Sequence, residues 1–262
     1  MLELIVRQAE GDSKKTPLLF VHGAWHGAWC WDEFFLPYFA RQGYTCYALS
    51  LRGHGNSPGR ERLRWTRVHE YVADVAQIVA QLPATPVLIG HSMGGFVVQK
   101  YLEQYAAAGA ILLAAVPPTG VLRTTLRIML HHPIPFLKVN LTLSLAPLIA
   151  TPELSRTHFF SAFMPAAQVN QYHQRLQDES YLGFLDFLAF NLVRQKRVKR
   201  LPLLVLGAEN DTIFSPQQVL QTAQAYGTQA EIFPDMAHDM MLEAGWQTVA
   251  DRMINWLNEK YP

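Results

Sequence analysis

A serine, an aspartate and a histidine stand at positions of this sequence where they could form a nucleophilic catalytic system. Ser92 is the central residue of Gly90-His91-Ser92-Met93-Gly94, a G-x-S-x-G pattern between the short apolar run 86–90 and the helix-like stretch 96–101. A turn of this kind, from strand to helix, holds a serine in a strained conformation with its hydroxyl exposed. The glycines let neighbouring backbone pass close by. We therefore predict that Ser92 is a nucleophile.

A serine nucleophile needs a histidine base whose ring is oriented by an acid. In proteins with this strand–turn–helix motif, the acid follows the serine along the chain and the histidine comes last. Asp211 lies shortly after the apolar run 202–206, and His238 is the only histidine that follows Asp211. Glu209, two residues before Asp211, is an alternative acid. The sequence thus predicts that Ser92, Asp211 and His238 form a triad.

Attack on a carbonyl places negative charge on its oxygen, which needs preorganised N–H donors. Losing one such donor costs roughly 3–4 kcal/mol. The backbone N–H of Met93, directly after the nucleophile, is one expected donor, and that of Ala24, after the apolar run 17–21, is the other. Three further residues are expected around the substrate, since one allows the loop to turn, one walls the pocket and one supports the nucleophile's turn: Gly23, Trp25 and His91.

Short apolar runs and helical patterns alternate along most of the chain. Runs of this length bounded by Gly and Pro are typical of strands buried on both faces; they cover residues 17–21, 44–49, 86–90, 109–114, 202–206 and 231–233. Apolar residues at helical spacing lie between them, at 72–82 and at 242–257. This alternation predicts an α/β fold with a mostly parallel central sheet and helices on both faces.

Residues 117–200 interrupt the alternation, because they contain apolar clusters, prolines and helix-like stretches such as 182–192 but no clear buried strand. We interpret them as an inserted, mainly helical cap, or lid, on a core formed by residues 1–116 and 201–262. The four histidines of the insertion are expected to be surface or packing residues: His131, His132, His158 and His173.

Composition excludes several classes of function. The net charge is +1, which argues against a nucleic-acid partner. The two cysteines, Cys30 and Cys46, have no metal-ligand spacing and are expected to be free thiols. The first ten residues lack the basic start and apolar run of a secretory signal, and no stretch is apolar enough for a transmembrane helix. We therefore expect a cytoplasmic protein with no integral membrane segment.

Several of these motifs together resemble the α/β-hydrolase superfamily, and the resemblance covers nearly all of the chain outside the cap. They are His22-Gly23, Leu51-Arg-Gly-His-Gly-Asn-Ser57, residues 90–95, residues 207–211 and Ala237-His238. The resemblance implies an α/β-hydrolase fold and a Ser-His-Asp triad that needs no metal and no cofactor.

Within the superfamily, residues 22–29 look like those of the plant methylesterase and hydroxynitrile lyase group. The lyases carry a threonine where this chain has Gly23 and need a lysine near the base, where this chain has Asp239 and Met240. This departure argues against a lyase. Haloalkane dehalogenases and epoxide hydrolases use an aspartate nucleophile, so Ser92 argues against both. Cofactor-free haloperoxidases and C–C bond hydrolases share the Ser-His-Asp triad, so the sequence does not exclude these two classes.

The expected function is hydrolysis of a carboxylic ester of a small to medium apolar substrate through an acyl-enzyme. Hydrolysis of a C–C bond in a diketone, of a thioester or of a lactone is an alternative, as is a ligand receptor with little turnover. Nothing in the sequence indicates an oligomeric state. The preference for an apolar small molecule comes from apolar residues of the cap, which could equally form the cap's own core: Leu126, Ile128, Met129, Leu130, Phe136, Phe159, Phe160 and Phe163.

Overall fold

A seven-stranded, mostly parallel sheet organises the protein. The structure is a computed structural model that describes residues 1–11 and 13–261. The strand order is β1-β3-β2-β4-β5-β6-β7, in which β1 is antiparallel to β3 and every other pair is parallel. The strands are β1 (Leu4–Arg7), β2 (Leu18–Val21), β3 (Cys46–Leu49), β4 (Val87–His91), β5 (Gly109–Leu113), β6 (Leu203–Ala208) and β7 (Ala230–Phe233).

The six predicted strands are confirmed, and the structure adds a seventh, β1. Every residue of β2, β4 and β5 is buried, which explains why these strands appear in the sequence as continuous apolar runs. The side chains of β1 are only partly buried, because this strand forms the edge of the sheet and pairs with β3 alone. Its residues Leu4, Ile5 and Val6 do form an apolar run, but no glycine or proline borders that run as in the predicted strands, and β1 was not predicted.

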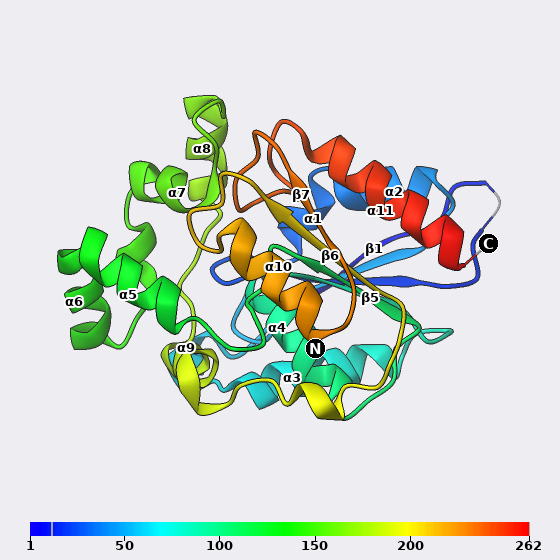
Figure 1. The fold of residues 1–262 in the computed structure, drawn as a ribbon, viewed down its shortest axis with the longest axis horizontal. Helices are drawn as coiled ribbons and strands as arrows, with labels where there is room; N and C mark the ends of the chain where they lie inside the picture. Colours follow the sequence, from blue (N-terminus) through cyan, green and yellow to red (C-terminus); the bar gives the residue numbers. More distant parts are fainter. Residues whose placement is uncertain (12, 262) are drawn as a thin grey trace.

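Helices cover both faces of the sheet (Figure 1). α2 and α11 lie together on one side, where the Phe34 and Trp246 rings stack with centroids 5.0 Å apart. α3 and α4 pack against each other on the other side. The core helices are α1 (Trp29–Asp32), α2 (Phe35–Arg41), the 3₁₀ turn η1 (Arg60–Trp65), α3 (Val68–Val79), α4 (Met93–Leu102), α10 (Pro216–Ala225) and α11 (Trp246–Lys260).

Two of the predicted helices are confirmed with different boundaries. α3 begins at Val68 and ends at Val79, so Leu82 lies beyond it. α11 begins at Trp246, and Leu242 belongs to the preceding turns, where its amide donates to the Asp239 carbonyl. In both cases the apolar spacing extends past the helix, because an apolar residue that packs on the core from a flanking turn satisfies the same pattern as one in the helix.

Between β5 and β6 the described residues form helices and turns but no strand. We call residues 117–200 the inserted segment. The predicted helical stretch 182–192 corresponds to α9 followed by a π-helical turn that ends at Phe190. The segment contains α5 (Leu122–His131), α6 (Pro133–Thr142), η2 (Ala146–Ile149), α7 (Pro152–Phe159), α8 (Ala166–His173), α9 (Tyr181–Leu185), η3 (Asp186–Phe190) and η4 (Gln195–Arg197).

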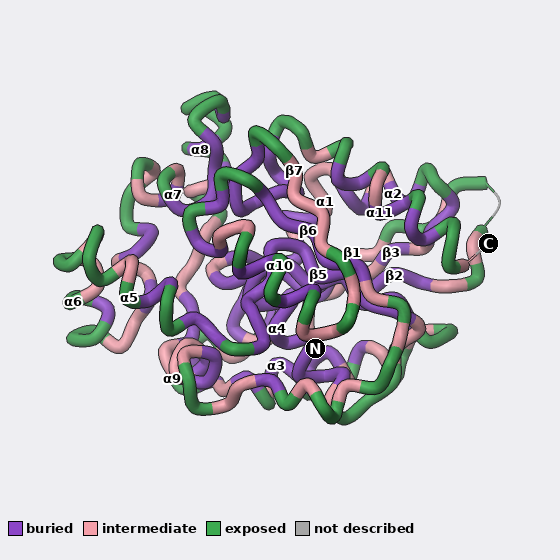
Figure 2. Tube along the Cα trace, viewed as in Figure 1, coloured by how far each residue is buried: buried purple, intermediate pink, exposed green. Residues whose placement is uncertain are grey.

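Burial separates the two regions (Figure 2). The sheet and the elements packed on it are largely buried, whereas α5 and α6, at one end of the molecule, are mostly exposed. Across the described residues, no helix combines the length and the apolar character that crossing a bilayer would need.

The turn from β4 into α4 depends on a glycine that touches the end of β2. A Cβ atom on Gly94 would overlap the backbone carbonyl oxygens of Val21 and His22. Neither carbonyl can move freely, because both belong to the buried end of β2 and the loop that follows it. The N-terminus of α4 can therefore lie this close to β2 only with glycine at position 94.

We predict that Gly94→Ala destabilises the protein although alanine is the better helix former. Helix propensity favours alanine by roughly 0.5–1 kcal/mol, but the overlap with backbone should cost more, for a net loss of about 1–3 kcal/mol. Urea denaturation would measure it. Gly245→Ala is the matched control, since a Cβ there would meet only the flexible end of Met236. Equal stability of the Gly94 variant and the wild type would contradict the argument.

Candidate active site

Ser92 sits at the junction of β4 and α4 in a strained backbone conformation. Its φ of 50° and ψ of −119° lie in a region that non-glycine residues rarely adopt. Backbone hydrogen bonds hold it there: its amide donates to the Leu113 carbonyl at 3.1 Å, and its own carbonyl accepts from the Val116 amide at 3.0 Å. Strain that is fixed by neighbouring strands keeps the side chain in one orientation.

The structure brings Ser92, His238 and Asp211 into one hydrogen-bonded line. His238 Nε2 lies 2.9 Å from Ser92 Oγ, and His238 Nδ1 lies 2.8 Å from Asp211 Oδ2. Asp211 is an acceptor, so Nδ1 carries the proton and Nε2 is free to accept the serine hydroxyl proton. All three side chains are buried.

Asp211, and not Glu209, is the carboxylate that contacts His238. Its second oxygen, Oδ1, accepts from the amides of Ile213 and Phe214 at 2.7 and 2.9 Å, which fixes the carboxylate. Glu209 is exposed, and its carboxylate accepts from the Asp235 amide at 3.4 Å. The helix predicted after Asp211 is present as α10, with Ser215 as its N-cap and Pro216 as its first residue.

The two predicted oxyanion donors, Ala24 and Met93, both line the cavity at Ser92. Met93 is the first residue of α4, so its amide has no acceptor within the helix. Ala24 follows β2, and its carbonyl accepts from His26 Nδ1 at 2.7 Å. That bond fixes the orientation of the peptide group that follows Ala24. Ala24, after β2, and Met93, after β4, therefore both lie beside the cavity at Ser92.

The cavity at Ser92 is narrow and apolar, with a volume of about 70 Å³. Typical small-molecule pockets have roughly 300–1,000 Å³, so this one fits only a small group without movement of its walls. Trp25 lines it, as predicted from the sequence. Its other walls come from the β5 end, the inserted segment and the loop after Asp211, and include Val116, Val121, Thr124, Thr125, Ile128, Leu145, Leu148, His158, Phe184, Phe187, Ile213 and Phe214.

Two residues predicted to surround the substrate lie behind Ser92 and not in the cavity wall. A Cβ on Gly23 would meet His91 Nδ1 at 2.7 Å and Ser92 Cβ at 3.0 Å, so Gly23 packs against the back of the turn. His91 is buried and donates from Nε2 to the His238 carbonyl at 3.0 Å. Both residues thus pack against the turn of Ser92, on the side away from the cavity.

His158 was expected to be a surface or packing residue, but the structure places it in the cavity wall. It is buried, and within the described residues its Nε2 has no hydrogen-bond partner. Burial, followed by the charge of nearby His132, lowers its pKa to about 4, so the ring is neutral at pH 7. Trp25 Nε1 is also buried without a partner in this part of the chain. These two groups are polar exceptions in an apolar wall.

A buried ion pair that was not predicted from the sequence joins the loop after β2 to the loop that contains His238. His26 Nε2 lies 2.9 Å from Asp239 Oδ2, and neither side chain is accessible to solvent. Both ring nitrogens of His26 face acceptors, the Ala24 carbonyl and the Asp239 carboxylate, so both are protonated. Burial opposes this charge, but Asp239 outweighs it and raises the pKa of His26.

This ion pair spans the site, because His26 holds the loop of Ala24 while Asp239 directly follows His238. Burial acts to raise the pKa of Asp239, and the charge and hydrogen bond of His26 overcome it, so that the pKa is lowered. The sequence offered one indication that these residues belong to the site. His26 comes two residues after Ala24, and Asp239 comes directly after His238. Nothing in the sequence indicates that positions 213 residues apart are paired.

The ligand atoms of His91, His238 and Asp239 lie within 4.8 Å of one another, a grouping that could in principle hold a metal ion. The ring nitrogens of His238 already bind Ser92 and Asp211, and Nε2 of His91 binds a carbonyl. A metal ion on this group would break the line that connects Ser92 to Asp211. The prediction that no metal or cofactor is needed stays a prediction.

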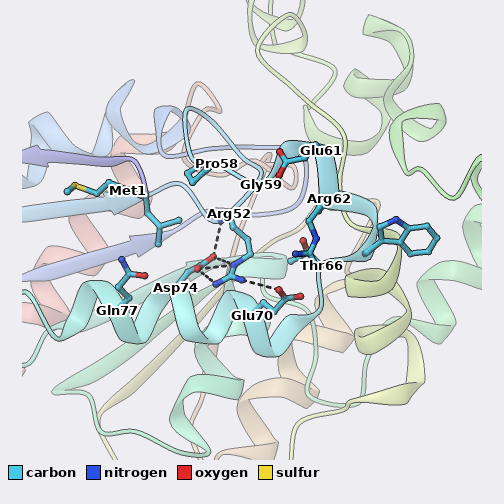
Figure 3. A pocket seen from close by; sticks show the side chains of 12 residues that line it. Met1, Arg52, Pro58, Gly59, Glu61, Arg62, Thr66, Glu70, Asp74 and Gln77 are labelled. Carbon is cyan, nitrogen blue, oxygen red and sulfur yellow. Dashed lines mark hydrogen bonds and ion pairs between the residues drawn. The ribbon is translucent and has the colours of Figure 1, made fainter.

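A larger hollow, of about 430 Å³, lies on the α3 side of the protein, away from Ser92 (Figure 3). Arg52 is its central charged group, and its guanidinium pairs with Asp74 at 2.6 Å and with Glu70 at 3.0 Å. None of the residues that line it also lines the cavity at Ser92. The hydrogen-bonded line of Ser92, His238 and Asp211 lies at the narrow cavity and not at this larger hollow.

Residues 18–252 match the model of the Alpha/beta hydrolase family. Norfluorocurarine synthase 1 from Strychnos sp is 34% identical over 117 residues, 43% of each chain. Esterase PIR7B from Oryza sativa subsp. japonica is 34% identical over 114 residues, 41% of this chain and 42% of that protein. The match thus spans about two fifths of the length of these relatives.

Among solved structures, a putative non-heme bromoperoxidase, BpoC, from Mycobacterium tuberculosis H37Rv superposes with a TM-score of 0.79 and 19% identity. The superposition covers 100% of this chain and 97% of that one. At this identity the likeness concerns the fold. The fold is therefore that of an α/β hydrolase, and the reaction has to be argued from the site.

We predict that His91 contributes to acid lability. Burial, with the charge of His238 as a second cause, lowers its pKa to about 3. The unfolded chain would protonate His91 near pH 6.5 while the folded protein does not, so stability falls as the pH drops from 6.5 towards 3. His91→Gln should reduce the loss between pH 7 and pH 5 by about 2 kcal/mol.

Urea denaturation of both proteins at the two pH values measures this difference. His69→Gln, the same change at an exposed position of α3, is the control. An identical pH dependence in His91→Gln and the wild type would show that the folded and unfolded chains protonate this ring at the same pH, which would contradict the lowered pKa.

Proposed function

The chain belongs to the alpha/beta hydrolase family, and on that basis we propose that it is a serine esterase that cleaves small apolar carboxylic esters. The observation that carries the proposal is the line of hydrogen bonds from Asp211 through His238 to Ser92 Oγ. A base that can accept from the hydroxyl and an acid that fixes its tautomer are the two groups that activate a serine. An esterase among the relatives supports the same class of reaction.

In the proposed mechanism, Ser92 Oγ attacks the ester carbonyl while its proton passes to His238 Nε2. The imidazolium that forms is stabilised by Asp211, which lies 2.8 Å from Nδ1. Negative charge develops on the former carbonyl oxygen and is stabilised by the amides of Ala24 and Met93. The proton on His238 then moves to the leaving alcohol, which departs and leaves an acyl group on Ser92.

Water completes the proposed cycle. His238, neutral again after the alcohol has left, accepts a proton from a water molecule that attacks the acyl carbonyl. The same two amides stabilise the second tetrahedral intermediate. Its collapse releases the acid, and the proton returns from His238 to Ser92. The steps use only the line from Asp211 through His238 to Ser92, the two amides beside Ser92, and the substrate and water.

The apolar wall of the cavity supports an apolar substrate. Phe214 and Ile213 come from the loop after the acid, and Leu145 and Leu148 come from the inserted segment. Of the eight apolar residues of this segment that suggested the preference, Ile128 is the one that lines the cavity. We propose that the inserted segment acts as the lid of the site, since its residues cover Ser92 and leave so little free volume.

The test of the proposed function is hydrolysis of p-nitrophenyl esters from acetate to palmitate. Ser92→Ala should abolish turnover. Asp211→Asn should lower kcat by about 10⁴-fold, because the histidine would adopt the wrong tautomer. Glu209→Gln, which changes the nearby acid that does not contact His238, is the matched control and should retain activity.

Activity that survives in Ser92→Ala would overturn the mechanism. A folded wild type that hydrolyses none of the esters would overturn the substrate class. That result would favour cleavage of a C–C bond, a thioester or a lactone, or ligand binding without turnover.

Chain-length preference should depend on Phe184, a partly buried residue of the cavity wall. Phe184→Ala opens space, and each additional buried methylene contributes about 0.8 kcal/mol, or roughly fourfold in kcat/KM. We therefore expect the ratio of hexanoate to acetate kcat/KM to rise in this variant. Phe190→Ala removes an equal side chain that is 74% exposed and outside the cavity. An equal shift in both variants would contradict the assignment of the cavity as the acyl site.

A further inference from the structure

The helix α5 exposes its apolar residues and buries its threonines. Leu122, Leu126, Met129 and Leu130 are exposed at spacings of four, three and one residues, which places them along one face of the helix. Thr124 and Thr125 are buried on the other side. A helix on a globular protein ordinarily turns its apolar stripe to the core. α5 does the opposite.

The next helix, α6, has the same property. Ile134, Leu137 and Leu141 are exposed at i, i+3 and i+7, while Val139 is buried. α5 and α6 pack against each other at one end of the molecule, far from the C-terminus (Figures 1 and 2). We call the seven exposed apolar side chains of α5 and α6 the hairpin face; they are between 37 and 75% exposed. Clustered exposure of this kind is typical of a docking surface.

The charged side chains of the two helices that form the hairpin face are all positive. Residues 104–152 contain no aspartate or glutamate, whereas Arg123 and Lys138 are exposed on the same two helices. The guanidinium of Arg127 is held by the backbone carbonyls of Thr212 and Ile213. The carboxylate of Asp178 accepts hydrogen bonds from Ser144 and from the amides that begin η2.

This charge pattern decides between possible occupants. Leucines flanked by arginine and lysine on a helical surface are the pattern of helices that lie in the headgroup region of a membrane. Two copies of the same face would bring like charges together without an acidic group to pair with them, which disfavours self-association. Anionic lipid headgroups would pair with Arg123 and Lys138 while the leucines enter the acyl boundary.

The hairpin face is joined to the cavity at Ser92 through a single helix. Thr124, Thr125 and Ile128 of α5 line the cavity. A surface that holds the exposed side of α5 therefore lies one helix diameter from the wall of the cavity. Apolar molecules dissolved in a bilayer would be concentrated at this position.

We propose that the hairpin face docks the protein on the surface of an anionic phospholipid bilayer. The apolar side chains of α5 and α6 insert at the headgroup boundary, and Arg123 and Lys138 bind the phosphates. The proposal concerns binding alone and does not depend on ester hydrolysis, because vesicle binding can be measured whether or not Ser92 is a nucleophile.

The experiment is flotation of the full chain with vesicles of phosphatidylcholine and with vesicles of equimolar phosphatidylcholine and phosphatidylglycerol. The wild type should bind the anionic vesicles, and the variant L126S/L130S/I134S/L137S should bind roughly tenfold more weakly. Leu220→Ser is the matched control, since Leu220 is 50% exposed on α10, outside the hairpin face. Arg123→Gln with Lys138→Gln should weaken binding and reduce its dependence on salt.

Thermal unfolding verifies that the serine variant is folded, because its four positions are on the surface. Equal binding to both kinds of vesicle would overturn the role of the charges. The proposal would be overturned as a whole if the wild type failed to float with anionic vesicles. It would likewise be overturned if the serine substitutions dissolved a dimer in sedimentation velocity runs without affecting flotation, since the occupant would then be a second copy.

Discussion

The contact between the N-terminus of α4 and the end of β2 determines how the site is assembled. Gly94 lies directly against the carbonyls of Val21 and His22, an approach that any side chain would prevent. The contact brings the first residue of α4, Met93, next to the loop that follows β2, which contains Ala24. The two proposed oxyanion donors are therefore neighbours because two backbones touch. The strained conformation of Ser92 lies in the same turn, directly before the helix that packs against β2.

Charged and hydrogen-bonded side chains then connect the loops that the sheet brings to one edge. The parallel strands β4, β6 and β7 end at one edge, which is why the loops that carry Ser92, Asp211 and His238 meet there. The buried pair of His26 and Asp239 adds a direct link between the Ala24 loop and the residue after His238. A buried ion pair stabilises little by itself, because desolvation offsets its attraction. Its contribution is specificity of position, since removing either partner would leave an unpaired charge inside the protein.

The inserted segment has two different surfaces. Its inner side completes the apolar wall around Ser92, and the outer side of α5 and α6 exposes leucines among positive charges. The proposed lid and the proposed membrane contact are thus the two sides of one helix. A small cavity beneath a helix with few core contacts suits a site whose wall moves when the helix binds a surface. Movement of α5 on binding a membrane would account both for the small cavity at Ser92 and for the exposed hairpin face.

The sequence by itself determined the strands of the sheet core, and it pointed to Ser92, Asp211 and His238, which the structure brings together. The extent of the cap stays a prediction. The strands and the three residues follow from local properties: buried strands leave apolar runs, a strand–turn–helix needs glycine at fixed positions, and Asp211 and His238 each follow such a run. The edge strand β1 was not predicted, because its short apolar run, residues 4–6, is not bordered by the glycines or prolines that mark the other strands.

Only the tertiary structure decided what depends on contacts between distant residues. It selected Asp211 over Glu209, placed Gly23 and His91 behind the nucleophile, moved His158 into the cavity wall and paired His26 with Asp239. It also showed that the leucines of α5 and α6 face outward, although their spacing is the same as that of a core helix. Helical periodicity fixes which residues share a face, but only the packing of the whole chain decides whether that face meets protein or solvent.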